Sequence, residues 1–141
     1  MKTVFISGSS KIKHLNKEMT DCLDELMKQD VQVIVGDCYG VDFLAQKYLK
    51  AHNFDRVTVY TSTETPRRSV YPNFVSLWEQ SQGKEGEEFY QVKDKAMCEA
   101  CDGAIAFWNG VSYGVKCNID RIKASGKPMK VIIEENNESK V

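Results

Sequence analysis

The chain has 141 residues, of which 42% are hydrophobic and 28% charged, and its formal net charge is -1. This length suits one domain with a core of its own. The near-zero charge argues against a general nucleic-acid binder, which usually carries a basic face. We find no apolar stretch long enough for a signal peptide or a membrane span, and therefore expect a cytoplasmic protein.

Short apolar segments alternate with amphipathic segments along most of the chain. The predicted strands are 3–7, 31–35, 57–61, 103–107 and 129–133, and the predicted helices are 15–29, 41–51, 88–101 and 112–124. Strands and helices that alternate at these lengths favour a parallel sheet with right-handed crossovers. We predict a Rossmann-like three-layer α/β/α sandwich with a mainly parallel five-stranded sheet of order 3-2-1-4-5. It forms a single domain over residues 1–134, followed by a polar tail at 135–141.

The segment 62–87 interrupts this alternation. A connection of this length in a compact domain is usually a lid, a binding loop or an oligomer contact. Phe74, Val75 and Trp78 have helical spacing, which favours a short helix packed on the sheet edge. A mobile lid over a ligand is the alternative, and the sequence leaves both open.

The chain has five cysteines, two of which, Cys98 and Cys101, have the CxxC spacing of zinc and redox sites. A structural zinc ion needs about four ligands, and no second pair of this spacing follows. Both cysteines also continue the apolar stripe of a predicted helix. We therefore expect buried thiols, with no metal and no cofactor.

Three segments that follow predicted strands combine glycine with small polar residues. They contain Gly8, Ser9 and Ser10 after the first strand, Gly36, Asp37, Cys38, Gly40 and Asp42 after the second, and Gly110, Ser112, Tyr113 and Gly114 after the fourth. A helix N-terminus behind such a segment offers N–H groups and partial positive charge to an anion. Carboxyl ends of parallel strands share one sheet edge, so these segments predict a nucleotide site there.

Several of these residues have two possible roles. Asp42 either complements the dipole of its helix or hydrogen-bonds a loop or a ribose hydroxyl. Ser112 suits a phosphate oxygen and equally an N-cap. Arg67, just beyond the third strand, borders the predicted cleft and has the fork geometry that binds phosphate.

The order and spacing of these motifs resemble the SLOG superfamily, which includes DprA and the Lonely Guy (LOG) phosphoribohydrolases. The resemblance covers about residues 3–133. It is carried by Gly8-Ser9-Ser10, by the segment 36–45, which is similar to Gly-x-Ala-x-Gly-Ala-Asp-x-x-Ala, and by the segment 110–114. The small stand-alone YspA-like members look most similar.

The resemblance implies a nucleotide or nucleotide-derived ligand, held by a sensor or sequestering module at the carboxyl end of the sheet. In LOG enzymes an Arg and a Glu carry N-glycosidic bond cleavage, and these positions fall at Lys93 and Asn118 here. An amide cannot replace a carboxylate as a base or as a partner of an oxocarbenium ion. The alternative is a hydrolase or transferase that uses Asp37, Asp42 or Asp94 instead.

The resemblance also bears on partners. DprA-like association with DNA is a third possibility, but the charge and the length argue against it, so the sequence predicts no nucleic-acid partner. Small SLOG domains tend to pair beside the cleft, and Tyr71, Phe74, Trp78 and Phe89 are candidate apolar contacts. We therefore expect a homodimer or a larger assembly of this chain.

Overall fold

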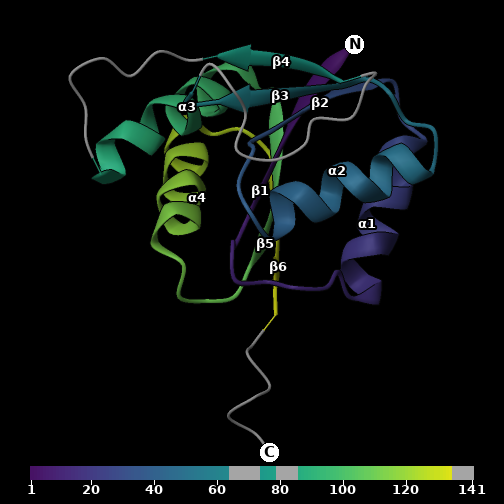
Figure 1. The fold of residues 1–141 in the computed structure, drawn as a ribbon, viewed down its shortest axis with the longest axis horizontal. Coiled ribbons are helices and arrows are strands. Elements are labelled where there is room, and N and C mark those ends of the chain that lie inside the picture. Colours follow the sequence, from purple (N-terminus) through teal and green to yellow (C-terminus); the bar gives the residue numbers. More distant parts are fainter. Residues whose placement is uncertain (64–73, 79–85, 135–141) are drawn as a thin grey trace, which may run out of the picture.

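The computed structural model describes residues 1–63, 74–78 and 86–134. Its strands are β1 (Lys2–Gly8), β2 (Val31–Val35), β3 (Val57–Thr61), β4 (Val75–Trp78), β5 (Gly103–Trp108) and β6 (Met129–Ile133), and its helices are α1 (Lys17–Met27), α2 (Val41–Ala51), α3 (Gly86–Ala100) and α4 (Tyr113–Ser125) (Figure 1). Within these residues no helix has the length and apolar character needed to cross a membrane.

All six strands form one parallel sheet of order β4-β3-β2-β1-β5-β6. The parallel α/β architecture and the relative order of the five predicted strands are confirmed. The predicted number of five strands is wrong, because Val75–Trp78 pairs with β3 as a sixth, edge strand instead of forming a helix. Four residues are too few for strand alternation to be distinguished from helical spacing.

The residues around β4 also correct one expectation about the surface. Phe74 is buried in the core, whereas Trp78 is exposed, so of these two described residues Trp78 alone has the predicted surface position. Tyr71, Arg67 and the side chain of Phe89 lie outside the described residues. The expected homodimer remains a prediction.

Helices cover both faces of the sheet, as its hydrophobic strands require. On one face, α1 and α2 bury Met19, Leu23 and Leu49 against Ile6 and Val33. On the other face, α3 and α4 pack against β1, β2, β3 and β5 through a set that includes Phe5, Ile34, Tyr60, Met97, Ala104 and Ile122. Burying a single large aliphatic side chain contributes about 1.5–3 kcal/mol, so these two layers hold the strand ends in place.

Glycine lets the start of α2 lie against the end of β1. A Cβ atom at Gly8 would lie 2.2 Å from Cβ of Val41. Gly40, with a φ of 73°, would place a Cβ 2.5 Å from the carbonyl oxygen of Ser9. Neither position has room for a side chain.

Ser9 connects the loops after β1, β2 and β5. Its N–H donates to the carbonyl oxygen of Phe107 at 3.0 Å, and its own carbonyl accepts from Val41 N–H at 3.3 Å. Its hydroxyl accepts from the N–H of Asn109 at 3.0 Å. Because Ser9 is fully buried, these bonds fix the relative positions of the three loops in the interior.

Replacing Gly8 by alanine tests the close approach of α2 to β1. We expect Gly8→Ala to lower the free energy of unfolding by about 1–3 kcal/mol, as overpacking does in a tight core. The matched control is Gly114→Ala, because a Cβ atom there meets no heavy atom within 4 Å. Urea unfolding measures the free energy of unfolding of both variants. Equal values for Gly8→Ala and Gly114→Ala would contradict the packing described for Gly8.

Candidate functional site

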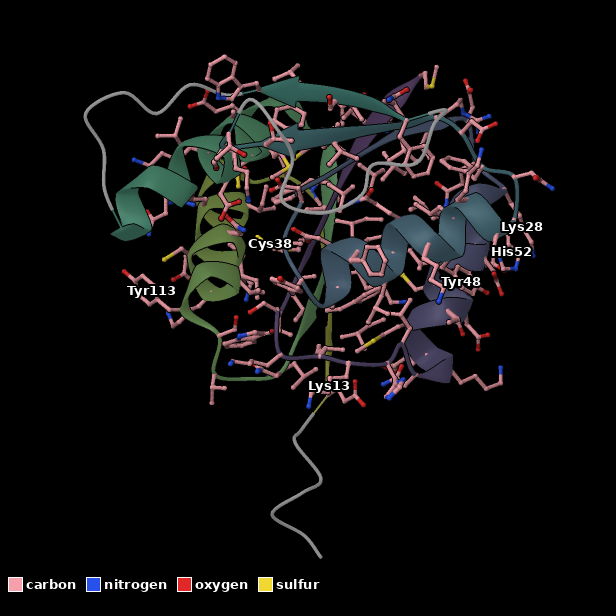
Figure 2. The ribbon with its side chains drawn as sticks, viewed as in Figure 1. Lys13, Lys28, Cys38, Tyr48, His52 and Tyr113 are labelled. Carbon is pink, nitrogen blue, oxygen red and sulfur yellow. The ribbon has the colours of Figure 1, made fainter. Side chains whose placement is uncertain are left out.

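A cleft of about 340 Å³ opens at the carboxyl end of the sheet. Its walls are the loops after β1 and β2, one side of α3 and the first turns of α4. Figure 2 shows Cys38 between α2 and α4, with Tyr113 pointing outward at the start of α4. The lining residues are Phe5, Ser7, Gly8, Ser10, Gly36, Cys38, Tyr39, Asp42, Lys93, Asp94, Met97, Ser112, Gly114, Val115 and Asn118.

The structure brings most of the predicted site residues to this cleft. Gly8, Ser10, Gly36, Cys38, Asp42, Ser112 and Gly114 line it, together with the positions singled out from the family resemblance, Lys93, Asp94 and Asn118. Ser9, Asp37, Gly40, Gly110 and Tyr113 do not line it. Ser9 and Asp37 are fully buried, and Gly40 packs against the backbone of Ser9 and Ser10. Tyr113 is exposed.

The N-terminus of α4 opens into the cleft. Ser112 is its N-cap residue but makes no side-chain capping bond. First-turn N–H groups of a helix have no intrahelical acceptor, and the missing side chain of Gly114 leaves space in front of them. Asn109 fixes the approach to the helix, because its Oδ1 accepts from the N–H groups of Val111 at 3.0 Å and Ser112 at 2.9 Å.

The other two predicted anion sites differ from this one. At the start of α2, the N–H of Val41 is bonded to the carbonyl of Ser9, and Oδ2 of Asp42 accepts from Cys38 N–H at 3.1 Å. The start of α1 is capped by Asn16, whose Oδ1 accepts from Met19 N–H at 2.9 Å. In α1 the side chain of Asn16 and in α2 the carbonyl of Ser9 each accept from one N–H group near the start of the helix, which the sequence alone could not show.

Lys93 places a buried cation in the cleft wall. The residue is 2% exposed, and its Nζ lies 3.4 Å from Oδ1 of Asp94 and 3.8 Å from Sγ of Cys38. A Cβ at Gly36 would lie 3.1 Å from this Nζ, so glycine provides the space for the ammonium group. Burial lowers the pKa of Lys93, but Asp94, Cys38 and Asp42 outweigh it and raise the pKa, so the charge persists at neutral pH.

Asp42 faces the same space above Gly36, where a Cβ would lie 2.6 Å from its Oδ2. Burial raises the pKa of this carboxyl to about 7, although Lys93 and the N–H of Cys38 both lower it. Asp94 and Asp37 add to the increase, because neighbouring negative charges disfavour ionisation. Asp42 therefore exchanges a proton near neutral pH.

Asn118, which the sequence resemblance aligns with the LOG glutamate, has its side-chain amide hydrogen-bonded within the protein. Its Nδ2 donates to the hydroxyl of Ser7 at 3.0 Å, and its Oδ1 accepts from Nη1 of Arg121 at 3.0 Å. Arg121 also donates to Oε1 of Gln91 at 2.8 Å and thereby ties α4 to α3. The sequence alone does not reveal this link, because Gln91 is 30 positions away from Arg121.

The CxxC pair has the predicted structural character. Cys98 and Cys101 are buried free thiols, and burial raises the pKa of Cys98 to about 11. Among the residues that the structure describes, no three His, Cys, Asp or Glu side chains are grouped to hold a metal ion.

A larger hollow of about 650 Å³ lies at the opposite, amino end of the strands. Its lining combines apolar residues with charged ones, and it contains none of the predicted site residues. The charged residues are Lys2, Glu18, Asp21, Glu25, Asp102 and Lys130. Its size alone gives no chemical reason to prefer it, because it faces no open helix N-terminus and no buried cation.

Comparison with known proteins identifies the fold. No protein-family model matches the chain, and no curated protein matches it. Among solved structures, the chain is similar to DNA processing protein A from Helicobacter pylori, with a TM-score of 0.69 and 18% identity over 97% of this chain and 67% of that one. The chain therefore has a DprA-like fold.

This similarity corrects the expectation about partners. The Helicobacter pylori structure concerns the single-stranded DNA binding mode of that protein. A protein of this fold thus binds nucleic acid, and the prediction of no nucleic-acid partner is wrong. Net charge is a weak ground for excluding such a partner, because it averages over the whole surface, whereas binding depends on local charge.

Asp42→Asn tests the titration of the buried carboxyl. A pKa raised in the folded state means that folding takes up a proton, so the stability from Asp42 is present at acidic pH and is lost as pH rises through about 7. A tenfold change in a protonation equilibrium corresponds to about 1.4 kcal/mol. We expect the melting temperature of Asp42→Asn to fall less than that of the unmodified chain between pH 5 and pH 8, and parallel curves would contradict this.

Proposed function

We propose that the chain binds a nucleotide in the cleft at the carboxyl end of β1, β2 and β5. The observation that carries this proposal is the open N-terminus of α4 in the same 340 Å³ cleft as the buried Lys93. Uncapped helix N–H groups bind phosphate oxygens, and a cleft of this volume is at the small end of ligand sites. The DprA-like fold agrees with a ligand of this class.

The charged side chains in the cleft indicate how a nucleotide would be oriented there. Asp42 and Asp94 line the cleft beside Lys93, and carboxylates in a confined space repel a phosphate group. The phosphate therefore binds at Ser10, Ser112 and the first turn of α4. The sugar or base then lies towards the two carboxylates, which accept hydrogen bonds from hydroxyl or amino groups.

Lys93 limits the negative potential of the cleft. Without its ammonium group, Asp42 and Asp94 would leave an anionic wall next to an anionic ligand. Its hydrogen bonds to Asp94 and Cys38 hold Nζ in place, so a ligand oxygen meets an ordered cation. In this proposal the ligand is bound by a sensor or sequestering module and is not turned over, because Asn118 is an amide committed to Ser7 and Arg121.

One observation favours the second candidate, a nucleotide N-glycoside hydrolase or transferase. Asp42 has a pKa of about 7 and lines the cleft, as suits a general acid that works at neutral pH. Incubation of the unmodified chain with AMP separates the two candidates. We expect no free adenine by liquid chromatography, and steady adenine release that Asp42→Asn abolishes would favour the hydrolase.

Gly114→Val tests the phosphate site directly. The side chain would project from the first turn of α4 into open space, where it blocks access to the helix N–H groups and leaves the core unchanged. We expect calorimetry to show that dAMP binds at least about tenfold more weakly, in line with the loss of a charge-assisted hydrogen bond.

The control for this variant is Gly114→Ala, which adds a single methyl group and retains much of the binding. Melting curves of both variants show whether the fold is intact. Unchanged dAMP affinity in a folded Gly114→Val protein would place the ligand elsewhere.

A further inference from the structure

A second hollow of about 500 Å³ adjoins the nucleotide cleft. It lies between the loop after β1 and the first turn of α2, and its lining residues are Ser10, Lys11, Ile12, Lys13, Tyr39, Gly40, Phe43 and Leu44. Ser10 and Tyr39 line both spaces. A ligand that passes over these two residues therefore enters the second hollow directly from the cleft.

Close packing and backbone hydrogen bonds hold together the segments that separate the two spaces. Gly40 lies so close to the loop after β1 that an added Cβ would be 2.6 Å from the carbonyl oxygen of Ser10. The N–H of Val41 and the N–H of Ile12 both donate to the carbonyl of Ser9, each at 3.3 Å. The two hollows thus keep a fixed separation, as subsites for adjacent units of one ligand require.

The second hollow is positively charged. Lys11 and Lys13 are exposed and form no ion pair within the part of the chain that the structure describes. The lining contains no carboxylate. In the cleft, by contrast, Lys93 is accompanied by Asp42 and Asp94. Figure 2 shows Lys13 on the loop after β1, at the outer side of the molecule.

Tyr39 places an aromatic side chain at the boundary between the cleft and the second hollow. It is 63% exposed, an unusual position for a large aromatic side chain next to a binding cleft. Aromatic side chains stack on bases of single-stranded nucleic acid, while lysines beside them contact the phosphates. An exposed tyrosine and two uncompensated lysines around one hollow match this combination.

From these observations we propose that the second hollow binds the next nucleotide of a single-stranded DNA whose 5′-terminal nucleotide occupies the cleft. Lys11 and Lys13 contact the linking phosphate, and Tyr39 stacks on the second base. This inference rests on the proposed function of the cleft. It makes a dinucleotide the smallest ligand that uses both spaces.

The test compares dAMP with the 5′-phosphorylated dinucleotide pdApdA by calorimetry. We expect the unmodified chain to bind pdApdA about tenfold more tightly than dAMP, the gain typical of one stacked base. The Lys11→Gln/Lys13→Gln variant should lose most of this gain and bind dAMP within about twofold of the unmodified chain. Its pdApdA affinity should also depend less on salt, because fewer counterions are released.

The matched control is Lys47→Gln/Lys123→Gln, which removes two exposed lysines that line neither hollow. Equal affinities of the unmodified chain for dAMP and pdApdA would overturn the inference and leave the proposed function standing. Equal losses for both ligands in the Lys11→Gln/Lys13→Gln variant would also overturn it. Binding of neither ligand would overturn both proposals, and tighter binding of the ribonucleotide pApA would assign the surface to RNA.

Discussion

The arrangement of the cleft depends on the hydrogen bonds of one buried serine. Ser9 joins the loops after β1, β2 and β5 through its N–H, its carbonyl and its hydroxyl. Because Ser9 is fully buried, leaving its N–H or its hydroxyl without a partner would cost about 1–3 kcal/mol. Asn109 in turn accepts a hydrogen bond from the N–H of Ser112 at the start of α4. The position of this helix N-terminus therefore depends on Ser9, which does not line the cleft.

A second constraint is electrostatic. Gly36 has no side chain, and the space it leaves is filled by the Asp42 carboxyl and the Lys93 ammonium. Buried charges are tolerated when they compensate one another, and here the cation belongs to α3 while Asp42 belongs to α2. The charge cluster therefore lies between helices from the two faces of the sheet, and in the proposed function it directs a phosphate towards the start of α4.

The features that could be predicted from the sequence are those that a local residue pattern determines. Apolar runs and amphipathic periodicity identified five strands and four helices, and glycine after strand ends identified the loops of the cleft. The sequence alone did not reveal β4, whose four residues are held by pairing with β3. It also could not assign Ser9 to the packing or show that Arg121 completes the hydrogen bonds of Asn118, because both depend on contacts between distant segments.

We propose that the ligand binds at the carboxyl edge of the sheet, although the larger hollow lies at the amino edge. The most direct test is an NMR titration of the ¹⁵N-labelled chain with dAMP. We expect the largest amide shifts at Ser10, Gly114 and Val115, and we expect them to saturate together. Saturable shifts centred on Thr3, Gly103 and Lys130, with none at the start of α4, would contradict this proposal.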